Sequence, residues 1–64
     1  MIEICTAILE KNNMVMLYAD ENGQGYAVLA YARGYALVDV YETTEIEFAN
    51  TYFDVLCRDM ADMV

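Results

Sequence analysis

The chain has 64 residues and a formal net charge of -8, from three basic and eleven acidic side chains. It contains no His, Ser, Pro or Trp. Nucleophilic hydrolases of the Ser-His or Cys-His type need a base beside the nucleophile, and tetrahedral zinc needs several Cys or His ligands. This composition excludes both in their ordinary forms. We therefore expect a protein that is not an enzyme, with no catalytic residues, no metal and no cofactor.

The length predicts a single domain over residues 1–64. A domain of this size buries only about 60% of the surface of its unfolded chain, so its stability is marginal unless something supplements the core. Cys5 and Cys57 are too few for a disulfide scaffold, and we expect free thiols that pack as small apolar side chains. Whether they lie close together is left open. With 59% apolar residues, self-association is the natural supplement.

No segment predicts export or membrane insertion. The start of the chain, Met1 to Cys5, carries Glu3 where a signal peptide needs positive charge. The longest nearly uncharged stretch, residues 26–38, is interrupted by Arg33 and is shorter than the roughly 20 residues of a membrane span. We expect a cytoplasmic protein without membrane contact.

Residues 2–41 are rich in β-branched and aromatic side chains and are punctuated by turn-like clusters at 11–13, 21–25 and 33–34. This pattern predicts four short strands at about 2–9, 14–20, 26–32 and 35–41. The alanines of residues 26–38 favour a helix there instead, because Ala is depleted in strands. Gly34 in the middle of that stretch favours a hairpin.

A two-residue turn at Arg33-Gly34 and a five-residue loop at 21–25 fix which residues share a face of the sheet. One face is predicted to be uncharged and to consist of Val15, Leu17, Ala19, Ala27, Leu29, Tyr31, Ala36, Val38 and Val40. The other is predicted to hold Met14, Met16, Tyr18, Asp20, Tyr26, Val28, Ala30, Tyr35, Leu37, Asp39 and Tyr41. The facing of the first strand stays open, because a turn at 12–13 and a turn at 11–13 give opposite results.

After Tyr41 the hydrophobic period changes from two to 3.6 residues. The segment from Thr44 to Glu47 fits a capping box, so a helix is predicted from Glu45 to about Met63. Its apolar stripe is predicted to pack on the uncharged sheet face and consists of Ala49, Tyr52, Phe53, Leu56, Met60 and Met63. The predicted fold is α+β: a small antiparallel four-stranded sheet (ββββα) with one C-terminal helix on one face.

The second sheet face has no predicted element to cover it and is rich in Tyr and Met, residue types that are enriched in protein interfaces. We expect it to bind a partner. A second copy in a homodimer is favoured over a different protein, because a homo-oligomer needs no other gene product. The residues predicted to make this contact are Met16, Tyr18, Tyr26, Tyr35, Leu37, Asp39 and Tyr41.

The acidic balance disfavours direct nucleic-acid binding and favours a basic protein partner. The expected function is a small acidic binding or inhibitor protein without catalysis, of the kind that phages and mobile elements direct against nucleic-acid-handling host proteins, by analogy of charge and size. One alternative is a structural homodimer without a basic partner. Another is a small enzyme that uses carboxylates such as Asp20 and Asp39, which share a face in the predicted register. No loop longer than five residues is predicted to enclose a substrate for it.

Overall fold

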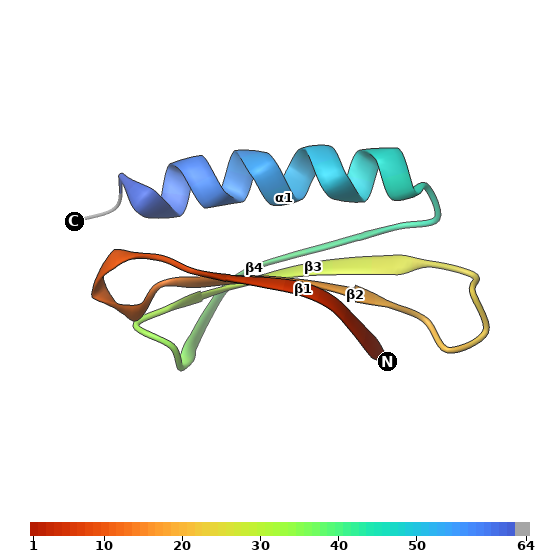
Figure 1. Cartoon of the computed structure of the whole chain (residues 1–64), viewed down its shortest axis with the longest axis horizontal. Helices are drawn as coiled ribbons and strands as arrows, with labels where there is room; N and C mark the ends of the chain where they lie inside the picture. Colours follow the sequence, from red (N-terminus) through yellow and green to blue (C-terminus); the bar gives the residue numbers. More distant parts are fainter. Residues whose placement is uncertain (63–64) are drawn as a thin grey trace.

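The computed structural model describes residues 1–62 and shows a two-layer α+β fold (Figure 1). Four strands form one antiparallel sheet in the order β1-β2-β3-β4, and one helix packs on one side of it. The elements are β1 (Ile2–Ile8), a 3-10 turn η1 (Glu10–Asn12), β2 (Met14–Ala19), β3 (Tyr26–Ala32), β4 (Ala36–Thr43) and α1 (Ile46–Ala61). The predicted ββββα fold is therefore confirmed, and residues 26–38 form strands and a turn.

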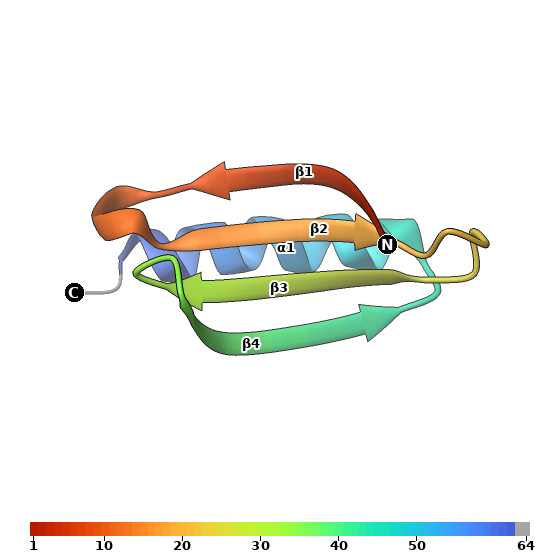
Figure 2. The same cartoon turned by 90° about the horizontal axis from the view of Figure 1, so that it is seen from below.

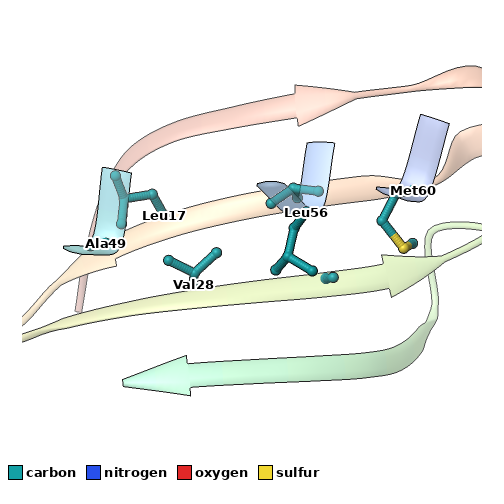
Figure 3. Packing of buried hydrophobic residues seen from close by; sticks show 7 residues of the cluster. Leu17, Val28, Ala49, Leu56 and Met60 are labelled. Atoms are coloured by element: carbon teal, nitrogen blue, oxygen red, sulfur yellow. The ribbon is translucent and has the colours of Figure 1, made fainter. Parts of the chain in front are cut away.

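The helix lies along β2 and β3, the two central strands (Figure 2). Its 16 residues span about 24 Å, which matches the roughly 23 Å of a seven-residue strand. Ala30 and Ala49 are fully buried, and small side chains at these positions let the helix approach the sheet closely. The core between the two layers consists of Val15, Leu17, Val28, Ala30, Ala49, Leu56 and Met60 (Figure 3).

The predicted apolar stripe of the helix is confirmed. Ala49, Leu56 and Met60 are buried, and Tyr52 and Phe53 pack half-buried against the same core. The last predicted member of the stripe, residue 63, lies outside the described residues.

The predicted register of the β2–β3 hairpin is wrong by one residue. Ala19 pairs with Tyr26, so the connecting loop includes Asp20. The Asp20 carbonyl accepts a hydrogen bond from the Gly23 N–H at 2.9 Å, and the Asp20 N–H donates to the Gly25 carbonyl at 2.9 Å. Asp is favoured at the first position of such a turn, and here it leaves the strand for the turn. A shift of one residue exchanges the two faces of β3 relative to β2.

The predicted turn between β3 and β4 forms at Arg33-Gly34, but the predicted pairing around it is wrong: Ala32 pairs with Ala36 and not with Tyr35, so three residues, 33–35, connect the strands. Arg33 and Gly34 have φ angles of 58° and 82°, and the Tyr35 N–H donates to the Ala32 carbonyl at 3.3 Å. Positive φ at both central positions defines a type I′ turn, whose twist suits a β-hairpin. Gly34 adopts this conformation without the steric cost that a side chain brings.

A β-bulge interrupts the pairing just beyond this turn. Tyr31 pairs with Leu37, whereas Ala30 pairs with Asp39, so Val38 has no direct partner on β3. The extra residue in β4 changes which side chains share a face. Leu37 lies on the face of Tyr31, and Asp39 lies on the face of Ala30.

These shifts correct the predicted faces of the sheet. On β2 the prediction holds, because Val15 and Leu17 are buried under the helix. On β3 and β4 it is wrong for most residues. The residues predicted under the helix that instead lie on the opposite face are Ala27, Leu29, Tyr31 and Val40. Those predicted on the opposite face that instead lie on the helix side are Tyr26, Val28, Ala30, Asp39 and Tyr41.

The structure also fixes the facing of β1, which the sequence leaves open. Cys5 and Ala7 pair with core residues of β2 and lie on the helix side, whereas Thr6 and Ile8 pair with methionines of the opposite face. A register shift between Glu3 and Cys5 interrupts the pairing near the start of the strand. Such bulges disturb the regular edge that another strand could extend.

The predicted capping box does not form. The helix begins at Ile46, and its N-cap residue, Glu45, makes no side-chain capping hydrogen bond. The Thr43 hydroxyl instead accepts from the Glu45 N–H at 3.1 Å. A hydrogen bond between a Thr hydroxyl and the N–H two residues later stabilises a turn. The hydroxyl that accepts is therefore that of Thr43, one residue before the Thr44 hydroxyl that a capping box would use.

Asn13 joins three parts of the fold. Its side chain is 4% exposed, donates to the Met60 carbonyl at 3.1 Å and accepts from the Arg33 N–H at 3.0 Å. Its backbone carbonyl accepts from the Leu9 N–H at 2.7 Å. The Met60 carbonyl lies in the last helical turn, where carbonyls lack a partner four residues ahead. One amide group therefore ties the β1–β2 connection to the β3–β4 turn and to the end of α1.

We predict that Asn13→Ala lowers the free energy of unfolding by about 1–3 kcal/mol, because it removes the partners of two polar groups that have little access to water. Urea denaturation followed by circular dichroism measures this loss. Asn50→Ala is the matched control, since Asn50 is an exposed asparagine of the helix. Equal unfolding midpoints for the two variants would contradict the role of Asn13.

Candidate protein-binding surface

The candidate site is the face of the sheet opposite α1, which we call the open face (Figure 2). The register places its side chains in three rows that cross the strands. The first row, nearest the β3–β4 turn, is Ile8, Met14, Tyr31 and Leu37. The middle row is Thr6, Met16, Leu29 and Val40. The last row is Glu3, Tyr18, Ala27 and Glu42.

The open face is apolar and accessible. Ile8, Leu37 and Val40 on the two edge strands are 70%, 52% and 46% exposed. The Met, Tyr and Leu side chains of the central strands are half-buried among one another, and the Tyr18 hydroxyl donates to the Met16 sulfur at 3.7 Å. A contiguous apolar surface of this kind is typical of a protein interface.

Charge is distributed unevenly along the open face. The first and middle rows carry none, and Glu3 and Glu42 lie in the last row. Lys11 in η1 and Arg33 in the β3–β4 turn lie at the other end of the sheet, beyond the first row (Figure 2). Glu10 also lies in η1, so this end holds two basic residues and one acidic residue. The surface therefore has an end with a net positive charge, an uncharged centre and an acidic end.

The predicted contact residues do not form one surface. Met16, Tyr18 and Leu37 lie on the open face as expected. Tyr35 lies in the β3–β4 turn and is 80% exposed. The three that lie on the helix side of the sheet instead are Tyr26, Asp39 and Tyr41. The residues of the open face that the predicted contact set omits are Ile8, Met14, Leu29, Tyr31 and Val40. Assigning Asp20 to the turn would have given the correct register, which places Leu29, Tyr31 and Val40 on the open face.

Asp39, Tyr41 and Tyr52 form a cluster between β4 and α1. The rings of Tyr41 and Tyr52 stack with centroids 4.3 Å apart and planes 19° from parallel. The Tyr52 hydroxyl donates to the Asp39 carboxylate at 2.6 Å. This hydrogen bond raises the pKa of Tyr52 above the ordinary tyrosine value, and burial and the negative charge of Asp39 raise it further. Asp39 therefore links the sheet to the helix, and its carboxylate accepts a hydrogen bond from within the same chain.

We predict that Tyr52→Phe lowers the free energy of unfolding at neutral pH by about 1 kcal/mol, because it removes this hydrogen bond. The raised pKa means that the folded state binds the phenolic proton more tightly than the unfolded state. Its contribution is therefore complete below the unfolded pKa, near 10.0, and is lost as the pH rises through the folded pKa. Urea titrations from neutral to alkaline pH measure this loss. Tyr35→Phe, at an exposed tyrosine, is the control, and identical alkaline profiles for the two variants would contradict the prediction.

The carboxylate pair considered for catalysis is not assembled. Asp39 pairs with Ala30, which in turn pairs with Val15, so Asp39 lies level with Val15 along the strands. Asp20 lies in the loop that follows Ala19. Five residues of strand separate the two levels, about 16 Å. Within residues 1–62 no group of three or more His, Cys, Asp or Glu side chains is placed to hold a metal ion.

A hollow of ≈ 410 Å³ lies at the acidic end of the molecule. It is lined by Met1, Asp20, Gln24, Gly25, Tyr26, Ala27, Glu42, Thr43 and Thr44. Asp20 and Glu42 are the two carboxylates of this lining.

Cys5 and Cys57 are free thiols in different environments. Cys5 is exposed on β1, and Cys57 is half-buried on α1. Burial raises the pKa of Cys57, and the negative charges of Asp54 and of a nearby Cys5 thiolate raise it further. Cys5 lies on the helix side of β1, and Cys57 packs against the core between the helix and the sheet.

We predict that Cys57 reacts with a thiol reagent at mildly alkaline pH about tenfold more slowly than Cys5, because the thiolate is the reactive form and the Cys57 thiolate is disfavoured. Cys57→Ala and Cys5→Ala each leave one thiol, and the reaction with a chromogenic disulfide measures its rate. Equal rates for the two folded variants would contradict the difference in environment. The rates should converge when the chains are unfolded in urea.

No known protein family, curated protein or solved structure matches this chain. Among residues 1–62, the helix is too short and too polar to cross a bilayer.

Proposed function

We propose that this protein acts by binding another protein and carries out no catalysis. The observation that carries the proposal is the open face. It presents apolar side chains from all four strands, and α1 covers only the other side of the sheet. Exposed apolar area of this extent costs solubility, and it is retained where a partner buries it.

The charge of the molecule supports a basic partner. The acidic residues of α1 and of its two capping positions are exposed: Glu45, Glu47, Asp54, Asp59 and Asp62. Arg58 is the basic residue of the helix, and the ion pair found within residues 1–62 joins the Met1 amino group to Glu21 at 3.1 Å. The carboxylates of the helix therefore project an uncompensated negative field, which attracts basic proteins and repels phosphate backbones.

The proposed role is that of a small acidic inhibitor or binding protein. By analogy of size and charge, it resembles the proteins that phages and mobile elements direct against nucleic-acid-handling host proteins. Its proposed compartment is the cytoplasm, where Cys5 and Cys57 stay reduced. A structural homodimer is the second candidate, and the charge pattern of the open face favours it for the reasons given below.

We predict that Leu37→Asp weakens binding of the partner by about tenfold or more, because it places a charge in the uncharged part of the open face. The experiment compares proteins retained from a host lysate by wild type, Leu37→Asp and Phe48→Asp. Phe48 is the matched control, since it is 58% exposed, close to the 52% of Leu37, and lies on the helix.

Support requires a basic protein that wild type and Phe48→Asp retain, that Leu37→Asp loses and whose retention falls with salt. Circular dichroism verifies that all three baits are folded. Identical sets of retained proteins for wild type and Leu37→Asp would refute the proposal that the open face is the binding surface.

A further inference from the structure

We infer that a second copy of this chain covers the open face, packed face to face with its strands antiparallel to those of the first copy. This inference rests on the proposed function, because it names the occupant of the surface proposed there. It is carried by the positions of four charged residues: Lys11, Arg33, Glu3 and Glu42.

The centre of the open face selects an apolar occupant. The first and middle rows, which include Met14, Met16, Leu29 and Leu37, contain no charged side chain. A basic surface placed there would lose its hydration without gaining an acidic partner, which is costly. The occupant must therefore present an apolar centre of its own, and this chain presents one.

The ends of the open face are complementary to each other. Lys11 and Arg33 lie in the connections at the end of the first row, and Glu3 and Glu42 lie in the last row at the other end. Within residues 1–62 none of these four side chains makes an ion pair. Two of the three basic residues of the chain therefore stand unpaired at one end of an apolar surface whose opposite end is acidic.

Two-fold symmetry leaves two ways to place one sheet on another. An axis that runs along the strands would set Glu3 of one copy against Glu42 of the other and would bring like charges together. An axis that runs across the strands through the middle row reverses the strand direction and sets the first row on the last row. This second arrangement places Lys11 near Glu3 of the second copy, and Arg33 near Glu42.

The distances suit this arrangement. Successive rows are two residues apart along a strand, about 6.6 Å. An extended Lys or Arg side chain has a similar length, so a basic residue beyond the first row can reach the acid of the facing last row. Sheets that pack face to face lie about 10 Å apart and nearly aligned, a geometry that two such apolar faces can adopt.

The area of the open face determines how tightly two copies are expected to bind each other. Strands of seven residues and four strand spacings give a footprint of about 440 Å² per copy. Two copies bury about 900 Å², below the roughly 1,200–2,000 Å² of stable complexes. The dimer is therefore expected to form reversibly in the micromolar range. It leaves the two acidic helices on opposite outer surfaces.

Sedimentation velocity from low to high micromolar concentration tests the dimer on the full chain. Arg33→Glu is expected to raise the dissociation constant about tenfold, and Arg58→Glu, the same charge change on the helix, is expected to leave it unchanged. The more demanding test uses two double variants, Lys11→Glu with Arg33→Glu, and Glu3→Lys with Glu42→Lys. In each double variant alone the four facing positions carry charges of one sign, so it should remain monomeric. Their mixture should form a heterodimer, because the facing ends are again opposite in charge.

A wild-type chain that stays monomeric throughout this range would overturn the inference. So would a dimer that the charge reversals leave intact, or a mixture of the double variants that does not associate. Circular dichroism verifies the fold, and Leu37→Asp provides a second test if a double variant fails to fold, since it should dissociate the wild-type dimer. If the chain is monomeric and Leu37→Asp still loses a captured partner, the proposed function stands and only the second copy is excluded.

Discussion

A single amphipathic helix has to cover a sheet of four strands, and this imbalance shapes the whole molecule. The helix reaches the two central strands, where Ala30 and Ala49 allow close approach and Leu56 fills the space between the layers. The edge strands gain less from it, and Cys5 of β1 and Ala36 of β4 remain exposed on the helix side of the sheet. Because a short domain has little apolar burial to spare, each attachment of helix to sheet matters, and the Asn13 amide and the Tyr52 hydroxyl supply two of them.

Local sequence patterns predict the elements of this fold well, because alternation and a 3.6-residue period are properties of single segments. They predict the facing of the sheet less well, because the register depends on where a loop begins. Asp20 has the polar side chain of a turn residue but extends the alternation of β2, and counting it in the strand shifts the pairing with β3 by one residue. The bulge at Val38 has no Gly or Pro to mark it and is fixed by pairing across strands.

The candidate site is predictable to the same extent. Met16, Tyr18 and Leu37 are placed correctly, whereas Asp39 and Tyr41 belong to the contact between helix and sheet. That contact joins residues 13 positions apart through a side-chain hydrogen bond, and no spacing rule links a strand carboxylate to a tyrosine in the following helix. One helix can cover only one face of a sheet, so an exposed face is predictable from the number of elements. Which residues lie on that face depends on the register.

The pattern of charge gives the open face a direction as well as a composition. Apolar contact alone would let two such faces meet in several rotations, since it has little orientational preference. Lys11 and Arg33 at one end and Glu3 and Glu42 at the other distinguish these rotations, and charges at a rim contribute more to the choice of orientation than to affinity. Two copies that each carry a charge of -8 also repel each other at long range. Five acidic residues and Arg58 give the helix and its capping residues a net charge of -4, half of the total, and this half lies away from the apolar centre. That placement weakens the repulsion across the contact, as a self-complementary face requires.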